Sequence, residues 1–460
     1  MAVVATVLIV GGVAVSKISG RSGGRTFQIA AAENVVINTD ATSVAAHNSP
    51  AIVRSPKDPA TLAVAARIDR PFRSGGLHLS HDDGSTWADV ALPAVPNSHE
   101  PFAPDIAFTG GGKLVVAFST VPRGGAVPSG VWVAGSDDGG HTLSPPVQLT
   151  GPAAFQVRIA AGPDERLYAT WLQADEAAVP ESCLPCFSRT GLPIVAASSA
   201  DGGATWSPPV VVSDPARARV GAATPAVAPD GSLYVLYQDF KEDRDDWENL
   251  DTPPHTGTFE LVVARSSDQG ATFTSASVDA ELRTLERFLV FFPKHPSLTV
   301  DPDGGLYVAW QDARTGDYDV LLSRSTDGGQ SWDGPVRVND DPVKNGRHQY
   351  LPVLSASVAG RLDALYFDRR DDPRNILVGA YFATSFDRGD NWQSIPVSTQ
   401  LYDSRIGPGS ERKNPDPGAR LGLVSDKSSA HAVWTDSRRG TLDTDKQDLF
   451  SARIVITRKS

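Results

Sequence analysis

Arginine and aspartate residues occur together in several loops of the chain, each just after an apolar run. The segments are WQDARTGDYD, YFDRRDDPRN, VWTDSRRGTLDTD and ARIDRPFRSG, and they contain Asp312 and Arg314, Asp368 and Arg369, Asp436 and Arg438, and Asp69 and Arg70. The fork of an arginine side chain matches the oxygens of a carboxylate, a sulfate or a phosphate. Grouped arginines of this kind could bind an acidic ligand. The alternative is an aspartate–arginine pair that stiffens each loop, since surface pairs of this kind are common.

A second set of polar and reactive side chains lies just before or at the start of other apolar runs. The set comprises His47 and Asn48, His99 and Glu100, Gln156 and Arg158, Lys294 and His295, residues 347–350 with His348 and Tyr350, and residues 411–414 with Glu411. Imidazole, phenol and carboxylate groups can act as bases or nucleophiles and can bind polar ligands. The alternative for each is a packed or hydrogen-bonded residue. Convergence of several of them would favour a functional site.

The two cysteines, Cys183 and Cys186, form a C-x-x-C pair in ESCLPCFS. The pair lies between strand patterns rather than at the start of a helix, which disfavours a thioredoxin-like redox motif. A zinc site would need two further ligands nearby, and none is evident. We therefore expect a small disulfide that pins a long loop, and we expect no metal and no cofactor.

The composition and charge of the chain limit which functions and folds are compatible with it. The chain has 460 residues and a net charge of −12, with no long run of lysine or arginine. It therefore lacks the basic stripe typical of nucleic-acid-binding proteins, and we expect no nucleic-acid partner. Its 41 glycines and 35 prolines predict many short strands joined by turns.

The N-terminal segment is apolar from Ala2 to Val15, and basic residues follow it. This length fits the core of a signal peptide better than a bilayer span, and a short membrane anchor is the alternative. We expect residues 1–25 to form this leader or anchor with a linker. Residues 26–460 would then form a single exported domain, either secreted or held at the cell surface.

One motif recurs six times at intervals of 56 to 67 residues and has the form Ser-x-Asp-x-Gly-x-Thr/Ser/Asn-aromatic, with leucine in place of the aromatic residue in the second copy. The copies are SHDDGSTW, SDDGGHTL, SADGGATW, SSDQGATF, STDGGQSW and SFDRGDNW, and their aspartates are Asp82, Asp138, Asp201, Asp268, Asp327 and Asp387. Around the fifth copy the chain contains four short runs, PSLTV, LYVAW, DVLLSRS and PVRVN. Four strands in each repeat predict an all-β fold, a β-propeller built of four-stranded antiparallel blades.

The number of blades depends on the two ends of the chain. Six motifs suggest six blades, but three more apolar runs follow at residues 419–426, 430–436 and 448–456. Residues 35–40 can supply the missing fourth strand beside residues 448–456. We therefore expect seven blades and a ring closed by hydrogen bonds, with a six-bladed ring as the alternative.

The repeated motif resembles the Asp box of sialidases and related propellers, also called the BNR repeat, over about residues 35–456. In this resemblance the six aspartates are structural turn residues. Sialidases bind the substrate carboxylate with three arginines and use a tyrosine nucleophile, a glutamate and an aspartate acid/base. By position, the resemblance suggests Asp69 as the acid/base, Tyr350 as the nucleophile and Glu411 as its partner. The Phe-Arg-Ile-Pro motif of the family is absent, because HNSPAIV stands there with Asn48 at the arginine position.

The order of strands predicts which face of the ring binds a ligand. The repeated motif connects the third and fourth strands, so it lies on one face with the turns between first and second strands. Long polar loops and the connections between blades lie on the other face, where we expect a ligand at the mouth of the channel. Our main hypothesis is an exported, sialidase-like propeller that binds a carbohydrate or another anionic ligand. The alternatives are a glycoside hydrolase of exo-α-sialidase type acting on acidic glycans and a scaffold that binds another protein.

Overall fold

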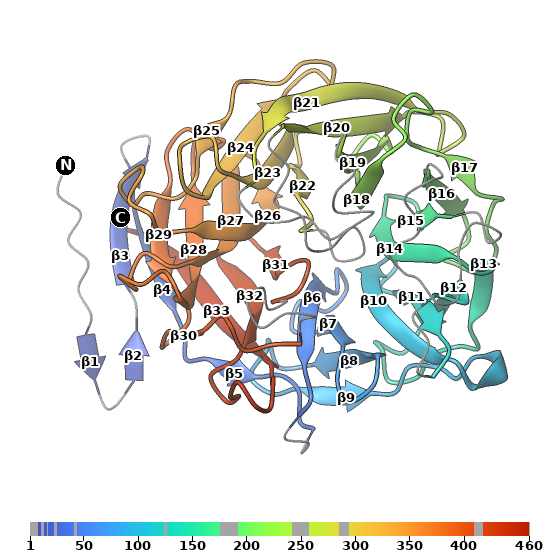
Figure 1. The fold of residues 1–460 in the computed structure, drawn as a ribbon, viewed down its shortest axis with the longest axis horizontal. Helices are drawn as coiled ribbons and strands as arrows, with labels where there is room; N and C mark the ends of the chain where they lie inside the picture. Colours follow the sequence, from blue (N-terminus) through green and yellow to red (C-terminus); the bar gives the residue numbers. More distant parts are fainter. Residues whose placement is uncertain are drawn as a thin grey trace.

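The computed structural model describes residues 8–10, 13–15, 17–22, 25–40, 44–123, 127–174, 192–241, 257–284, 294–408 and 417–459. These residues form seven four-stranded antiparallel blades arranged in a ring (Figure 1). The protein is therefore a seven-bladed β-propeller, as the sequence predicts, and the six-bladed alternative is wrong.

The first strand of each blade lies nearest the axis of the ring, and the later strands follow outward (Figure 1). Blade one contains β6 (His47–Arg54), β7 (Leu62–Ile68), β8 (Ser74–Ser80) and β9 (Ala88–Val90); blade two β10 (Glu100–Phe108), β11 (Leu114–Val121), β12 (Gly130–Ser136) and β13 (Val147–Thr150); blade three β14 (Ala154–Ala161), β15 (Leu167–Gln173), β16 (Ile194–Ser199) and β17 (Val210–Val211). Blade four contains β18 (Val220–Val227), β19 (Leu233–Asp239), β20 (Phe259–Ser266) and β21 (Thr274–Leu282); blade five β22 (Ser297–Val300), β23 (Leu306–Asp312), β24 (Asp319–Ser325) and β25 (Val336–Arg337); blade six β26 (Gln349–Val358), β27 (Arg361–Asp368), β28 (Leu377–Ser385) and β29 (Gln393–Pro396), beside which β30 (Tyr402–Asp403) pairs with β28.

Burial differs along each blade because neighbouring sheets pack face to face. The second strand is covered on both sides, so it reads as a nearly continuous apolar run, and all eight residues of β11 are buried. The outermost strands are half exposed, as in β13 and β17. Large side chains such as Trp171, Trp310 and Trp434 fill the space between sheets and are fully buried. The core is therefore a ring of layers between blades.

The last blade combines both ends of the chain, as predicted. Its inner strands are β31 (Gly422–Ser425), β32 (Ser429–Asp436) and β33 (Asp448–Lys459), and β5 (Val35–Val36) pairs with β33 next to Phe450. The amide of Ile37 continues the ladder by donating to the carbonyl of Leu449 at 2.9 Å. Buried Asn38 donates to Asp448 at 2.9 Å. Closure by the N-terminal segment leaves no open edge at this seam.

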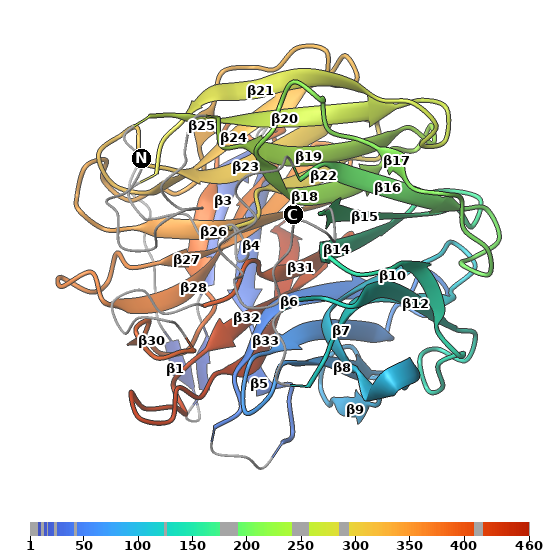
Figure 2. The ribbon, with the colours of Figure 1, turned by 45° about the vertical axis from the view of Figure 1, so that its right-hand side comes forward.

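The N-terminal segment adds two further strands outside β5. The strand β4 (Arg25–Ala31) pairs with the C-terminal half of β33, and β3 (Lys17–Ser22) pairs with β4 (Figure 2). Two short strands, β1 (Leu8–Val10) and β2 (Val13–Val15), form a separate hairpin. The strand β3 therefore lies inside residues 1–25, whose role as a leader or anchor stays a prediction. Among the described residues, no helix has the length and apolarity to cross a membrane.

The repeated motif forms the turn between the third and fourth strands of blades one to six. In blade three, the amide and hydroxyl of Thr205 and the hydroxyl of Ser199 all donate to the carboxylate of Asp201 at 2.6–2.9 Å. Gly203 has a φ of +90° and donates its amide to Ser199 at 2.9 Å. The threonine and backbone hydrogen bonds lower the pKa of Asp201 to about 2. The backbone amide bond to the carboxylate recurs at the other five aspartates, Asp82, Asp138, Asp268, Asp327 and Asp387. The motif therefore holds a turn together.

We call the face with these turns the turn face. The opposite face, which carries the loops between second and third strands and the connections between blades, is the loop face.

Candidate functional site

The innermost strands share a bulge in the half nearer the loop face. In β6, β10, β14, β18 and β26 the pairing register shifts at equivalent positions. The residue at each bulge has a positive φ; these residues are Ser49, Ala103, Gln156, Ala222 and Leu351, and Gly418 has the same feature before β31. This conformation is unfavourable for residues other than glycine, so its repetition around the axis indicates a common backbone requirement. The bulge resets which side chains face the channel.

Charged side chains occupy the position two residues after the bulge in three blades. Asp105 of blade two, Arg158 of blade three and Arg420 of blade seven hold this equivalent position. Nε of Arg158 donates to Asp105 at 2.9 Å, and a terminal nitrogen of Arg420 lies 3.1 Å from the other carboxylate oxygen. Equivalent strand positions thus converge, because they come from different blades around one axis.

The positive charge at this place exceeds the negative charge. Two guanidinium groups share one carboxylate, and Asp105 is only 3% exposed. Burial lowers the pKa of Arg420, and the charge of Arg158 lowers it further against the opposing effect of Asp105. Burial opposes ionisation of Asp105, but the two arginines hold its pKa below the usual value. An additional anion would be electrostatically favourable here.

The predicted acid/base Asp69 lies at the edge of this arrangement. It follows β7 and accepts hydrogen bonds from Nε of Arg67 at 3.0 Å and from Nδ2 of Asn48 at 2.8 Å. The charge of Arg67 also lowers the pKa of Arg420. Asn48, which stands at the arginine position of the sialidase motif, therefore orients a carboxylate.

His295, another predicted site residue, lies beside the same arginines. It precedes β22, is 8% exposed, and donates its backbone amide to the carbonyl of Ala419 at 2.9 Å. Burial and the charges of Arg158 and Arg420 lower its pKa well below the usual value. Among the described residues, its Nδ1 atom has no hydrogen-bond partner. A neutral imidazole thus belongs to this group of side chains. We call the group the channel cluster, and its members are Arg67, Asp69, Asp105, Arg158, His295 and Arg420.

Tyr350, the predicted nucleophile, lies at the start of β26, between blades six and seven. A nitrogen of Arg369 is 3.5 Å from the tyrosine hydroxyl, and its guanidinium carbon is 5.0 Å from the ring centroid. Arg369 also donates to Ser404 at 3.0 Å. Tyr350, Ser404, Tyr402 and Gln447 help line a very small cavity of about 10 Å³, the space of about one water molecule. Tyr350 is therefore closely packed, and it lies in a different blade from Arg158 and Asp69.

The predicted loop arginines Arg314 and Arg438 bind the aspartates of their own loops. Arg314 contacts Asp312 at 2.8 Å and Asp279 at 2.7 Å, and Arg438 contacts Asp436 at 2.6 Å. Both loop aspartates are completely buried, and each accepts the indole N–H of a tryptophan two residues earlier at 3.0 Å. This geometry matches the loop-stiffening alternative, and ligand binding by these two arginines stays a prediction.

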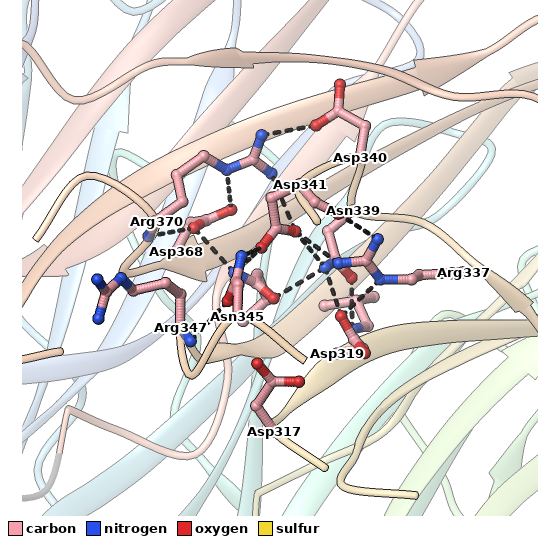
Figure 3. A network of polar contacts seen from close by, with 12 residues as sticks. Asp317, Asp319, Arg337, Asn339, Asp340, Asp341, Asn345, Arg347, Asp368 and Arg370 are labelled. Carbon is pink, nitrogen blue, oxygen red and sulfur yellow. Dashed lines mark hydrogen bonds and ion pairs between the residues drawn. The ribbon is translucent and has the colours of Figure 1, made fainter. Parts of the chain in front are cut away.

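Blade six departs from this pattern, because Asp368 pairs with Arg370 and not with Arg369. Nε of Arg370 donates to Asp368 at 2.7 Å, and Gln349 donates to the same carboxylate at 3.1 Å (Figure 3). Burial raises the pKa of Asp368 to about 6. The network continues through Asp341, which is in turn bound by Arg337 at 2.8 Å. These side chains join blade five to blade six, and Arg369 instead contacts Tyr350, Ser404 and the carbonyl of Asn375.

The remaining predicted residues have different positions. Nδ1 of His348 accepts the amide of Tyr318 at 3.2 Å, and their rings meet edge to face. Arg70 lies on the loop face, 3.3 Å from Asp445. Glu411 and the expected disulfide of Cys183 and Cys186 lie outside the described residues. Within the part of the chain that is described, no three histidine, cysteine or acidic side chains are placed to hold a metal ion.

The sequence reasoning singled out Arg158 and His295 but missed Arg67, Asp105 and Arg420. The missing signal is the register of the inner strands. Aligning FAPD, FQVR and PGAR on the bulge residue would have placed Asp105, Arg158 and Arg420 in one ring of positions.

Comparison with known proteins identifies the fold. No family model and no curated protein matches this chain. Among solved structures, a protein of unknown function from Dyadobacter fermentans DSM 18053 is similar with a TM-score of 0.53 and 15% identity, covering 93% of this chain and 99% of the other. The phage phi92 endosialidase has a TM-score of 0.51 and 14% identity over 93% of this chain and 70% of its own. An ulvan lyase bound to -[GlcA(1-4)Rha3S]- has a TM-score of 0.51 and 9% identity over 83% and 91%. At these identities the likeness is one of fold.

Proposed function

We propose that the protein binds an acidic carbohydrate at the channel cluster. The observation that carries this proposal is the pair of arginines, Arg158 and Arg420, that share a single buried carboxylate. A carboxylate or sulfate group of a ligand would compensate the excess positive charge and accept hydrogen bonds from both guanidinium groups. Because the chain carries a net charge of −12, this local excess of positive charge is opposite in sign to the protein as a whole.

The place of the cluster supports a ligand site and not a purely structural ion pair. Arg158 lies in β14 and Arg420 lies just before β31, and their side chains keep 16% and 12% of their surface exposed. Ligands of repeat folds commonly bind where several repeats present loops on one face. Two of the similar propellers are named for acidic glycans: the endosialidase, and the ulvan lyase bound to glucuronic acid and sulfated rhamnose. We also propose that the protein is exported, where such glycans would be met.

A glycan array tests this proposal. The wild-type protein should bind uronic, sialic or sulfated glycans and leave the neutral glycans of the array unbound. Arg158→Gln should abolish this signal, because it removes one of the two guanidinium groups. The matched control is Arg324→Gln on the turn face, where Arg324 contacts Asp333 and Asp390, each at 2.7 Å. Equal binding of neutral and acidic glycans, or equal loss in both variants, would refute the proposal.

A second candidate function is hydrolysis of an acidic glycoside. The contact between Arg369 and Tyr350 favours it, because a nearby guanidinium stabilises a phenolate and so activates a tyrosine nucleophile. Turnover of 4-methylumbelliferyl glycosides of sialic or uronic acids is the test. Activity should be lost in Tyr350→Phe, whereas binding on the array should be retained. If no acidic glycoside is turned over, the hydrolase candidate is rejected and the binding proposal stands.

A further inference from the structure

An exposed aromatic ring lies on the same loop as the channel cluster. The loop between β7 and β8 begins with Asp69, a member of the cluster, and continues to Phe72, whose ring side chain is 56% exposed. Among the described residues this is the highest exposure of any large apolar side chain. On the loop that begins with Asp69, this ring offers a flat apolar surface on which a ligand of the neighbouring polar site can pack.

Phe72 packs against one arginine and has two more beside it in the sequence. The guanidinium carbon of Arg123, from the next blade, lies 5.0 Å from the ring centroid, and this side chain is 68% exposed. Arg70 and Arg73 flank the ring in sequence, and Arg70 is half exposed. Arg70 forms an exposed ion pair with Asp445 at 3.3 Å, and Arg123 forms a longer one with Glu100 at 3.8 Å. An exposed aromatic surface with one guanidinium group packed on it, and two further arginines adjacent in sequence, suits a ligand with both an apolar face and acid groups.

We propose that the ligand is an extended acidic glycan, which places one acid group in the channel cluster and stacks a further sugar on Phe72. This inference rests on the proposed function and deepens it by naming an oligosaccharide, not a single terminal sugar, as the ligand. The C–H face of a pyranose packs on an aromatic ring, and its carboxylate or sulfate lies within reach of Arg70 and Arg123. Phe72 is three positions after Asp69 in the sequence, which is at most about 11 Å of extended chain. A short oligosaccharide bridges this distance.

Charge and shape argue for a glycan over other occupants. An obligate protein interface is built around a large apolar patch, whereas the exposed ring of Phe72 packs against the charged side chain of Arg123. A stacking platform with arginines at its rim instead recognises a repeating ring with acid substituents.

Titration calorimetry with a galacturonate hexasaccharide and with the galacturonate monosaccharide tests the inference. Phe72→Ala should weaken binding of the hexasaccharide about tenfold, corresponding to about 1.4 kcal/mol, and leave binding of the monosaccharide unchanged. Phe72→Tyr should retain the affinity for both. Val211→Ala is the matched control, because Val211 is 51% exposed on blade three. Because Phe72 is exposed, its replacement should leave the melting temperature unchanged.

The variants separate the two proposals. Arg158→Gln should weaken binding of both sugars, since both place an acid group in the channel cluster. If Phe72→Ala leaves the hexasaccharide affinity unchanged while Arg158→Gln lowers it, the extended-ligand inference is overturned and the proposed function stands. If Arg158→Gln changes neither affinity, the proposed function fails, and the inference fails with it.

Discussion

The substitution Asp105→Asn tests whether this one carboxylate holds Arg158 and Arg420 of the channel cluster together. Asp105 is buried and lies within 3.1 Å of both Arg158 and Arg420. At an effective dielectric constant of about 20, each of these contacts is worth about 5 kcal/mol before desolvation. Removing one partner of a buried ion pair costs about 3–5 kcal/mol in practice. The amide oxygen can still accept the backbone N–H of Ile159, so we expect a loss of about 3 kcal/mol.

Urea unfolding measures this loss, with Asp303→Asn as the control. Asp303 makes an exposed ion pair with Arg388 at 3.3 Å, for which a cost of about 0–1 kcal/mol is expected. Asp105→Asn should also increase the affinity for an acidic sugar, because an acid group of the ligand replaces the missing carboxylate. The reasoning is refuted if Asp105→Asn is no more destabilising than Asp303→Asn, or if it weakens binding as Arg158→Gln does.

Three other predictions concern the scaffold. Asn38→Ala should lower the free energy of unfolding by about 1–3 kcal/mol, because it leaves Asp448 and the amide of Leu449 without their buried partner at the ring seam; chemical denaturation checks this. Acid should destabilise the protein as the pH falls from about 4 towards 2, because the repeated-turn aspartates have lowered pKa values in the folded state, about 2 for Asp201. Urea unfolding midpoints across this pH range should show the loss of stability, and Asp201→Asn should make the midpoint depend less on pH. An unchanged pH dependence in Asp201→Asn would contradict this prediction. Arg438→Gln should reduce the melting temperature by freeing buried Asp436 while leaving glycan binding intact, and lost binding at an unchanged melting temperature would contradict this.

The fold could be predicted from the sequence because its information is local and repeated. Each Ser-x-Asp-x-Gly turn marks the end of a third strand, and the unpaired run at residues 448–456 required a strand from residues 35–40. The pairing of Val36 with Phe450 confirms this closure.

The channel cluster could not be predicted in the same way. Its members Asp105, Arg158 and Arg420 have different sequence neighbours and share only a register position, which the bulge sets. A bulge changes which side chains face inward, so simple alternation along a strand does not show which residues meet at the axis. The aspartate–arginine pairs of the loops are conspicuous in the sequence and were therefore predicted as ligand-binding residues. In the structure, Arg438 pairs with Asp436 of its own loop.

The most direct test of an acidic-ligand site in the channel is a comparison of one sugar chain in charged and neutral form. Titration of the wild-type protein with galacturonate hexasaccharide and with its fully methyl-esterified form provides it, at two salt concentrations. We expect only the acid form to bind, with an affinity that falls as salt increases and is lost in Arg158→Gln. Equal affinity for the two forms, or an affinity of the acid form that does not depend on Arg158, would contradict the proposed function.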